Sequence, residues 1–287
     1  MTREEKLSAF RALHERPGAF VMPNPWNAGT AKILTALGFE ALATTSAGYA
    51  FAVGRLDSSA ALSRLEVLAN AAEIVSATHL PVSADLEDGF GRDPAACAET
   101  IRMAAEAGVV GGSIEDATGD PDQPIYDFSL AVERIAAASE AARDCGFVLT
   151  GRAENFLHGR PDLDETIARL RAFEAAGADV LYAPGLPGLD AIRLVCSSVG
   201  KPVNVVMGLR GALLSVNDLA AAGVKRISVG GSFARAALGA FVAAAREVRE
   251  NGSFGYAQSA LPHSEARAFM AGSGEETFSR TDAPGTS

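Results

Sequence analysis

The fold is decided by residues 82–116, which read VSADLEDGFGRDPAACAETIRMAAEAGVVGGSIED. Two short apolar stretches, Val82–Asp85 and Gly111–Glu115, flank an alanine-rich segment with helical spacing, and acidic residues follow both. This pattern predicts a strand, a helix and a second strand parallel to the first in one sheet. The acidic residues would then converge at one edge of that sheet. Converging carboxylates repel unless a cation lies among them, so the stretch indicates an enzyme that uses a hard metal ion.

The same alternation of strand and helix patterns continues along the chain. Predicted strands lie at Phe20–Met22, Ala41–Thr45, Val82–Asp85, Gly111–Glu115, Val148–Arg152, Val180–Ala183, Val203–Val206 and Ile227–Val229. Predicted helices include Thr2–Glu15, Asp93–Ala107, Asp162–Ala176, Leu189–Val199 and Ser232–Asn251. Eight such units predict an α/β protein with a (β/α)8 TIM barrel. A doubly wound open sheet gives the same linear pattern and stays open as the alternative.

The length allows one barrel, because folds of this type need about 250 residues. We expect residues 1–252 to form a single barrel domain that includes the N-terminal helix. The Gly/Ser/Thr-rich end loses apolar periodicity, so residues 253–287 are predicted to be a C-terminal extension, either a mobile tail or an arm on a partner subunit.

Charge and cysteine content narrow the classes of partner. The chain has 25 basic and 35 acidic residues, a net charge of 25 − 35 = −10, which disfavours binding to nucleic acid. Its three cysteines, Cys97, Cys145 and Cys196, are widely spaced, as in a protein of a reducing compartment. No apolar run reaches the roughly 18 residues of a membrane span, so we expect a cytoplasmic protein without a membrane partner.

Polar residues at the predicted strand ends form the candidate site, because the carboxyl ends of parallel strands surround one mouth. They are Asn24, Trp26, Asn27, Thr45, Ser46, Asp85, Glu87, Glu115, Asp116, Arg152, Glu154, Asn155, Asn204 and Ser228. Several carboxylates, a cation and one arginine can hold a small anionic substrate while charge builds on its oxygen. An all-oxygen ligand set favours Mg²⁺, with Mn²⁺ as a substitute. Metal affinity should then fall as the pH approaches the ordinary carboxyl pKa of about 4.

Structural roles are the alternative for several of these residues. Asp93 and Asp162 are expected only to cap helices, and Arg152 could serve a structural ion pair. Trp26 could pack the barrel mouth instead of touching substrate. His158, in the loop after the fifth strand, is a candidate general acid or base, or a solvated side chain.

The acidic motifs resemble those of the isocitrate lyase/phosphoenolpyruvate mutase superfamily. Residues 85–91, Asp-Leu-Glu-Asp-Gly-Phe-Gly, follow its Asp-x-Asp/Glu-x-Gly-Tyr/Phe-Gly signature, and Ile114-Glu115-Asp116 is similar to its next metal-site motif. Residues 151–155, Gly-Arg-Ala-Glu-Asn, resemble its arginine motif, and Asp57 falls where the family has a further acid. The similarity extends over roughly residues 20–241.

The resemblance implies roles for individual residues. Asp85 would contact the metal directly, while Asp57, Glu87 and Glu115 would act mainly through its water molecules. Catalytic roles are expected for Arg152, which would face an enolate, and for Glu154 and His158. Substrate binding is expected of Trp26, Thr45, Ser46, Ala47, Asp85, Arg152 and Asn204, the three residues of the 45–47 turn holding a carboxylate or an oxyanion.

The resemblance also implies an assembly and a type of reaction. Members of this superfamily are (β/α)8 barrels that exchange their last helix between subunits, which implies a homodimer or a homotetramer with Ser232–Asn251 exchanged. Their reactions make or break a C–C or P–C bond next to a pyruvate-like enolate.

Three departures separate this chain from the known lyases and mutases. The loop at residues 117–126 has no cysteine, lysine or histidine, whereas lyases carry Lys-Lys-Cys-Gly-His there. Ala183-Pro184-Gly185 lacks the glutamate of lyases and the histidine of mutases, and Asn204 comes two positions early. Tyr126, Asp120 or His158 would therefore have to replace the missing acid.

These observations predict a Mg²⁺-dependent enzyme that acts on a C–C bond of a small 2-oxo or 2-hydroxy di- or tricarboxylate, as a lyase or a hydrolase. Phosphonopyruvate P–C chemistry is the alternative within enzymes. A catalytically silent protein that binds a 2-oxo acid is the alternative from another class.

Overall fold

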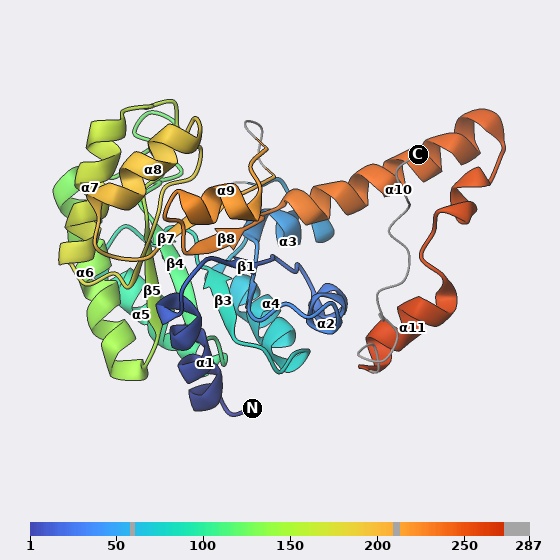
Figure 1. The fold of residues 1–287 in the computed structure, drawn as a ribbon, viewed down its shortest axis with the longest axis horizontal. Helices are drawn as coiled ribbons and strands as arrows, with labels where there is room; N and C mark the ends of the chain where they lie inside the picture. Colours follow the sequence, from blue (N-terminus) through green and yellow to red (C-terminus); the bar gives the residue numbers. More distant parts are fainter. Residues whose placement is uncertain (58–60, 209–212, 273–287) are drawn as a thin grey trace.

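Eight parallel strands form one sheet that curves into a barrel (Figure 1). The computed structural model describes residues 1–57, 61–208 and 213–272. The strands follow the order β1-β8-β7-β6-β5-β4-β3-β2. They are β1 (Phe20–Met22), β2 (Leu42–Ala43), β3 (Val82–Asp85), β4 (Gly111–Glu115), β5 (Val148–Arg152), β6 (Val180–Tyr182), β7 (Val203–Val206) and β8 (Arg226–Ser228). The predicted (β/α)8 architecture is confirmed, and the open doubly wound sheet is wrong.

The ring closes between the first two strands through hydrogen bonds at the mouth. Ala43 N donates to Pro23 O at 3.0 Å. Asn24 extends this closure, because its Nδ2 donates to Thr44 O at 2.9 Å and its Oδ1 accepts from Val229 N and Gly230 N at 2.9 Å each. Asn24 therefore ties the ends of β1, β2 and β8 together.

Helices connect the strands and cover the outside of the barrel. They are α1 (Arg3–Glu15), α2 (Ala28–Ala36), α3 (Ser46–Ala52), α4 (Arg64–Ser76), α5 (Pro94–Glu106), α6 (Phe128–Cys145), α7 (Leu163–Ala175), α8 (Leu189–Ser198), α9 (Val216–Ala221), α10 (Ser232–Asn251) and α11 (His263–Ala271), with a short 3₁₀ helix η1 (Gly255–Gln258). Asp93 and Asp162 cap α5 and α7, as predicted, by accepting hydrogen bonds from Ala95 N and Glu165 N. No helix of the described ranges is both long and apolar enough to cross a lipid bilayer.

Three strands are shorter or shifted relative to prediction, each for a local reason. β2 ends at Ala43 because Thr45 turns to cap α3, where its Oγ1 accepts from Gly48 N. β6 stops at Tyr182, just before the Ala183-Pro184 turn, since proline has no N–H for a ladder. β8 ends at Ser228, because Val229 N binds the Asn24 side chain.

The amino end of the barrel is closed by α1, which leaves the carboxyl end open for a site. Phe10 is fully buried and lies against Gly111 of β4. A Cβ at residue 111 would come within 2.7 Å of the Phe10 ring, so glycine is required for this close approach. Phe10 belongs to an apolar cluster with Leu7, Leu13 and Phe20 that seals the floor.

The C-terminal part leaves the barrel along α10, which projects away from it, and returns through η1 and α11 (Figure 1). Helix α11 contacts α2, and Lys32 Nζ donates to Met270 O at 2.8 Å. Residues 263–271 were not predicted to be helical, and the end at 273–287 lies outside the described residues. The domain division at residue 252 and the exchange of α10 between subunits stay predictions.

Candidate active site

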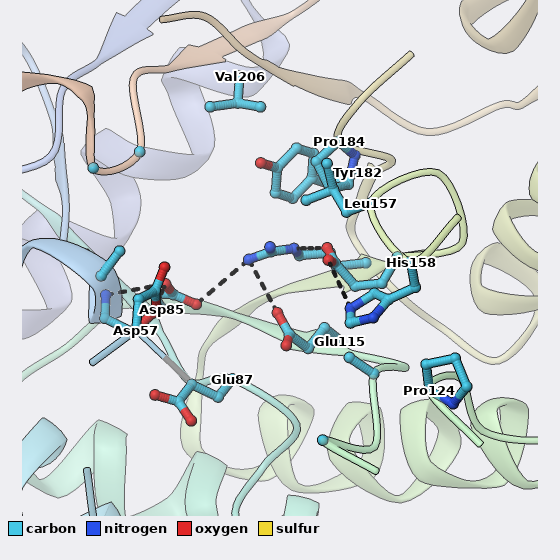
Figure 2. A pocket seen from close by; sticks show the side chains of 18 of the residues that line it. Asp57, Asp85, Glu87, Glu115, Pro124, Leu157, His158, Tyr182, Pro184 and Val206 are labelled. Carbon is cyan, nitrogen blue, oxygen red and sulfur yellow. Dashed lines mark hydrogen bonds and ion pairs between the residues drawn. The ribbon is translucent and has the colours of Figure 1, made fainter. Parts of the chain in front are cut away.

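A cavity of about 530 Å³ lies at the carboxyl ends of the strands (Figure 2). Twelve residues were predicted to bind the metal, bind the substrate or act in catalysis. Ten of them line this cavity, namely Thr45, Ser46, Ala47, Asp57, Asp85, Glu87, Glu115, Arg152, Glu154 and His158. The parallel register explains much of this grouping, because Glu115 on β4 pairs with Arg152 on β5, and both side chains follow the ends of their strands. The predicted convergence of strand-end residues is thus present.

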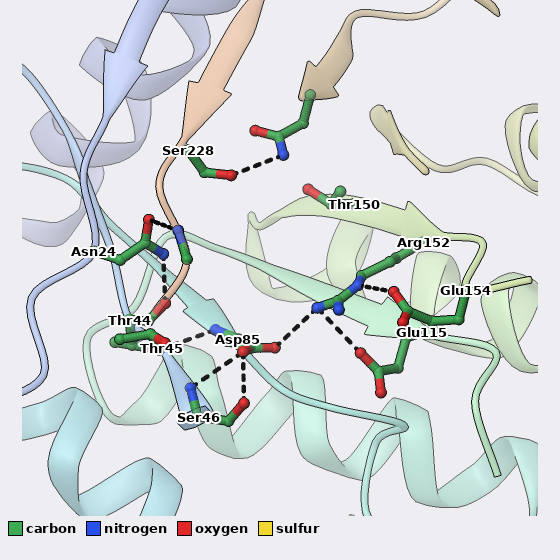
Figure 3. A network of polar contacts seen from close by, with 12 residues as sticks. Asn24, Thr44, Thr45, Ser46, Asp85, Glu115, Thr150, Arg152, Glu154 and Ser228 are labelled. Atoms are coloured by element: carbon green, nitrogen blue, oxygen red, sulfur yellow. Dashed lines mark hydrogen bonds and ion pairs between the residues drawn. The ribbon is translucent and has the colours of Figure 1, made fainter. Parts of the chain in front are cut away.

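Arg152 lies at the centre of an acidic cluster (Figure 3). Its Nη1 is 3.1 Å from Glu115 Oε2 and 3.6 Å from Asp85 Oδ1, and its Nε donates to Glu154 Oε1. Burial alone would lower the pKa of Arg152, but the Glu115 and Glu154 carboxylates outweigh it and raise that pKa well above its ordinary value. The guanidinium is therefore a permanent cation facing three carboxylates.

Asp85 is held by the first residue of α3. Its Oδ2 accepts from Ser46 N at 3.2 Å and from Ser46 Oγ at 2.8 Å, and its own N–H donates to Thr44 Oγ1 at 2.9 Å. The other oxygen, Oδ1, is buried and accepts no hydrogen bond. Because both donors of Ser46 are bound to Asp85, the predicted role of the 45–47 turn in holding a substrate carboxylate stays a prediction.

The loop after β3 has an unusual backbone. Glu87 and Phe90 have φ values of 47° and 59°, in the left-handed region that residues with a side chain seldom adopt. Arg134 of α6 stabilises this loop by donating to the carbonyl oxygens of Asp88, Gly91 and Arg92. Strain of this kind is retained where surrounding contacts fix the loop, and it is common in active sites.

Burial raises the pKa of several acidic side chains of the cavity, and these side chains outnumber the positively charged groups around them. Burial, with the nearby Asp85 and Asp88, raises the pKa of Glu87 to about 8. Burial also raises the pKa of Glu115 well above its ordinary value, and burial with Asp85 raises that of Asp57. The predicted acid limb of metal binding near pH 4 must therefore move up, because Glu87 would still be protonated well above that pH.

These residues fit a divalent cation. Among the described residues, Asp85 Oδ1 and Glu87 Oε2 are buried acceptors without a hydrogen-bond partner, and Asp85 Oδ1 has only a 3.6 Å ion pair with Arg152 Nη1. Buried carboxylate oxygens with so little compensation favour a bound cation. Within the part of the chain that the structure describes, no group of three or more His, Cys, Asp or Glu side chains is placed so that it could hold a metal ion by itself. An ion with one direct carboxylate ligand and several bound waters, as Mg²⁺ prefers, suits such an open arrangement.

Glu154 connects Arg152 to His158. One carboxylate oxygen accepts from Arg152 Nε, and the other lies 3.9 Å from His158 Nε2, within ion-pair range but beyond a hydrogen bond. Glu154 is itself almost fully buried, whereas the imidazole is one-third exposed in the cavity. A buried carboxylate can orient this ring toward a ligand.

A second layer of contacts fixes Glu154. The buried Asp116 carboxylate accepts from Glu154 N at 2.8 Å and from Arg169 Nη1 of α7 at 3.1 Å. The main chain of Asp116 binds Arg152 O and Tyr126 N as well. Asp116 therefore joins the ends of β4 and β5, the 117–126 loop and α7.

Two predicted residues do not line the main cavity. Trp26 is absent from its lining, and its carbonyl accepts from Asn70 Nδ2 at 3.1 Å. Asn204 lies deeper, at a cavity of about 60 Å³ inside the barrel, where it binds Ser228 Oγ at 3.1 Å and Arg226 Nε at 2.9 Å. The substrate contacts predicted for these two residues stay predictions.

Sequence reasoning missed Tyr182, which lines both cavities. It pairs in register with Arg152 on β5 and Asn204 on β7, and the Arg152 guanidinium lies 5.0 Å from the centre of its ring. Its place as the last residue of a strand would have been the signal, but the predicted strand, Val180–Ala183, ran one residue beyond it.

Comparison with known proteins agrees with this geometry. The sequence model of the family named phosphoenolpyruvate phosphomutase matches residues 10–249. A 2-methylisocitrate lyase from Shewanella oneidensis is 32% identical over 209 residues, which cover 70% of this chain and 70% of that protein.

Solved structures show the same similarity. A protein from Burkholderia cenocepacia J2315, assigned only provisionally as a lyase or mutase, is 60% identical with a TM-score of 0.91, covering 94% of this chain and 96% of that one. A phosphonopyruvate hydrolase in complex with oxalate and Mg²⁺ is 25% identical with a TM-score of 0.83, covering 95% of each chain. Since the family match spans most of its length, the chain belongs to the phosphoenolpyruvate phosphomutase family, within the isocitrate lyase/phosphoenolpyruvate mutase superfamily.

Proposed function

We propose that the protein is a Mg²⁺-dependent enzyme that cleaves a C–C bond of a small 2-oxo or 2-hydroxy di- or tricarboxylate, as a lyase or a hydrolase. The observation that carries the proposal is a pair of buried oxygens, Asp85 Oδ1 and Glu87 Oε2, that accept no hydrogen bond from the described residues and lie in a cavity that also holds the Arg152 guanidinium. The relatives support it, since they include a 2-methylisocitrate lyase and a hydrolase bound to Mg²⁺ and oxalate.

The residues of the cluster divide into metal and substrate roles. A bound Mg²⁺ would polarise the oxygen of a 2-oxo acid and offset the charge that builds on it, and Mn²⁺ could substitute. Asp85 would hold the ion through Oδ1, which accepts no hydrogen bond from the described residues, and Asp57, Glu87 and Glu115 would bind the water molecules around it. Arg152 would face the pyruvate-like enolate and stabilise its negative oxygen.

Among the three candidates for the missing acid, the geometry favours His158. The Tyr126 hydroxyl donates to Asp88 Oδ2 at 3.0 Å, and burial raises its pKa to about 12. Asp120 is exposed at the mouth, where its Oδ1 accepts from Asp122 N. His158 lines the cavity beside Glu154.

The proton step assigned to His158 is simple. In a 2-hydroxy acid, the hydroxyl loses its proton to water and becomes a carbonyl as the C–C bond breaks. The electron pair of that bond stays on the departing carbon, and an N–H of the protonated imidazole donates its proton to that carbon. The neutral ring is then reprotonated from water. Glu154 would orient the ring, since its buried carboxylate lies 3.9 Å from Nε2.

The alternatives have weaker support. P–C chemistry on phosphonopyruvate is favoured by the similarity to the hydrolase, but residues 117–126 contain no lysine or arginine to meet a phosphonate. A silent binding protein would explain why that loop lacks the cysteine of the lyases. A panel of isocitrate, methylisocitrate, oxaloacetate, substituted malates and phosphonopyruvate separates the three, because turnover of any one excludes a silent binder.

The experiment that tests the proposal is calorimetry with oxalate, a stable mimic of the pyruvate enolate, in the presence and absence of Mg²⁺. We expect Mg²⁺-dependent binding in the wild type and its loss in Asp85→Ala. Asp93→Ala is the matched control, because Asp93 only caps α5 and should retain binding. Absence of Mg²⁺-dependent binding in the wild type, or equal affinity in Asp85→Ala, would show that the proposal is wrong.

We further propose that the protein forms a homodimer or a homotetramer by exchange of α10. This helix projects from the barrel (Figure 1), and among its residues only Ala234 is buried. Its apolar side chains include Phe241, which is 70% exposed. A cytoplasmic location, and the lack of nucleic-acid or membrane partners, stay predictions.

A further inference from the structure

Tyr182 has a buried side chain with a hydroxyl that is left without a partner. The residue is only 9% exposed, yet its hydroxyl makes no hydrogen bond with any residue in the described ranges. Buried tyrosine hydroxyls are normally paired, and Tyr126 illustrates this by donating to Asp88 Oδ2 at 3.0 Å. The Tyr182 hydroxyl differs from these, because it keeps contact with solvent and is not among the buried polar atoms that lack a partner. It is therefore a donor that is available to a ligand in the cavity.

The position of the ring places the hydroxyl at the binding cavity. Tyr182 lines the main cavity of about 530 Å³ and the deeper one of about 60 Å³, so it stands where the two adjoin. Figure 2 shows the ring beside Pro184 and Leu157 with its hydroxyl turned away from both. Asp85 and Arg152 line the same two cavities, so Tyr182 lies at the end of the main cavity where these two residues also lie.

The charges around Tyr182 make a neutral donor useful. Burial raises the pKa of Tyr182, and the carboxylates of Glu154 and Asp85 add to that rise against the opposing Arg152, so the phenol stays protonated. Carboxylates can only accept hydrogen bonds, and Arg152 already contacts three of them. An anionic ligand in this cavity needs a further donor that is not already engaged.

We propose that the Tyr182 hydroxyl donates a hydrogen bond to an anionic oxygen of the bound 2-oxo acid, which makes Tyr182 a substrate-binding residue. The inference rests on the proposed function, because it takes the 2-oxo acid as the ligand. It predicts that the ligand lies with one oxygen over the β6 end of the cavity, next to the Arg152 guanidinium.

The test is oxalate binding with Mg²⁺ to the Tyr182→Phe variant, which lacks only the hydroxyl. We expect affinity to fall by about 10- to 100-fold, the range for one hydrogen bond to a charged group. Tyr256→Phe, in the exposed η1 segment, should bind like the wild type.

Two further measurements separate a binding role from a structural one. The Tm of Tyr182→Phe should match that of the wild type, because no internal hydrogen bond is lost, whereas Tyr126→Phe should melt earlier. Oxalate should also change the near-ultraviolet absorption of tyrosine in the wild type and not in Tyr182→Phe.

The outcomes are distinguishable from failure of the proposed function. If the wild type binds oxalate, Asp85→Ala loses it and Tyr182→Phe keeps both affinity and spectral change, only the Tyr182 inference is overturned. A lower Tm with unchanged affinity would likewise overturn it in favour of a packing role. If the wild type does not bind oxalate with Mg²⁺, the proposed function and this inference both fall.

Discussion

Replacing Asp116 by alanine should lower the free energy of unfolding more than replacing any exposed acidic residue near it by alanine. Its carboxylate accepts from Glu154 N at 2.8 Å and from Arg169 Nη1 at 3.1 Å, in a site where Asp116 is 2% exposed. The variant would leave a buried N–H unpaired and remove the buried partner of the Arg169 guanidinium. Breaking a buried ion pair on one side costs about 3–5 kcal/mol of unfolding free energy, and we expect a loss in that range.

Two companion variants test whether burial sets this magnitude. Glu165 binds the same guanidinium at 2.9 Å but is much more exposed, so Glu165→Ala should cost less than about 1 kcal/mol. Asp116→Asn should cost about 1–3 kcal/mol, because the amide oxygen can still accept from Glu154 N while a hydrogen bond to a charged group is lost. Burial raises the pKa of Asp116 to about 6, because it penalises the charged form of the carboxyl group.

The assay is urea unfolding at near-neutral pH and fixed protein concentration, with stability obtained from the midpoint and slope. A lower midpoint with an unchanged slope would indicate a loss of stability alone. Should Asp116→Ala cost under 1 kcal/mol, or no more than Glu165→Ala, the view of Asp116 as the buried junction behind Arg152 and Glu154 would be refuted. Oxalate affinity should weaken in parallel, because Glu154 loses the contact that fixes its main chain.

Two other predictions concern charge and assembly. In the metal-free protein, the raised pKa of Glu87, about 8, implies stability that is fully present below its ordinary value near 4.5 and is lost as the pH rises through 8. Glu87→Gln should flatten this decline of Tm with pH measured in a chelator, and an unchanged profile would contradict the assignment. On α10, Phe241→Asp should shift the sedimenting species toward monomer, since Phe241 is 70% exposed in one chain. Arg246→Asp on the same helix reverses an existing charge without removing an apolar side chain, so it should leave the oligomeric state unchanged. Equal oligomeric states for wild type and Phe241→Asp would argue against exchange of α10.

Much of the barrel could be predicted because its signals are local. Five strands have the predicted bounds, among them Val82–Asp85 and Gly111–Glu115, since apolar runs, glycine stops and helical spacing mark their ends. The predicted strand ends are wrong where tertiary or turn contacts end the sheet. At Val229, for example, the backbone N–H donates to the Asn24 side chain instead of to a neighbouring strand. Helix α11 was missed because it depends on packing against α2, which no local pattern reveals.

The candidate site was predictable as a set of positions and not as a set of contacts. Strand ends place Asp85, Glu115 and Arg152 at one mouth whatever their rotamers. That Ser46 binds Asp85 depends on the start of α3, and that Asn204 lies below the main cavity depends on how far it sits along β7. Both are tertiary facts that spacing does not encode.

The excess of negative charge links the stability of this protein to its function. Arg152 contacts Asp85, Glu115 and Glu154, so one positive charge faces three acids, and Glu87 adds a fourth at the same cavity. The repulsion between these carboxylates can be reduced by binding protons or by binding a cation. Burial raises the pKa of Glu87 and of Glu115, so we expect protons to reduce the repulsion in the metal-free chain and a divalent ion to displace them. Binding of that ion should therefore release protons near neutral pH, and the released protons would be observed as a dependence of the heat of Mg²⁺ binding on the ionisation enthalpy of the buffer. Since this coupling arises from burial of the acids in one mouth, it should vanish if those acids were solvated separately.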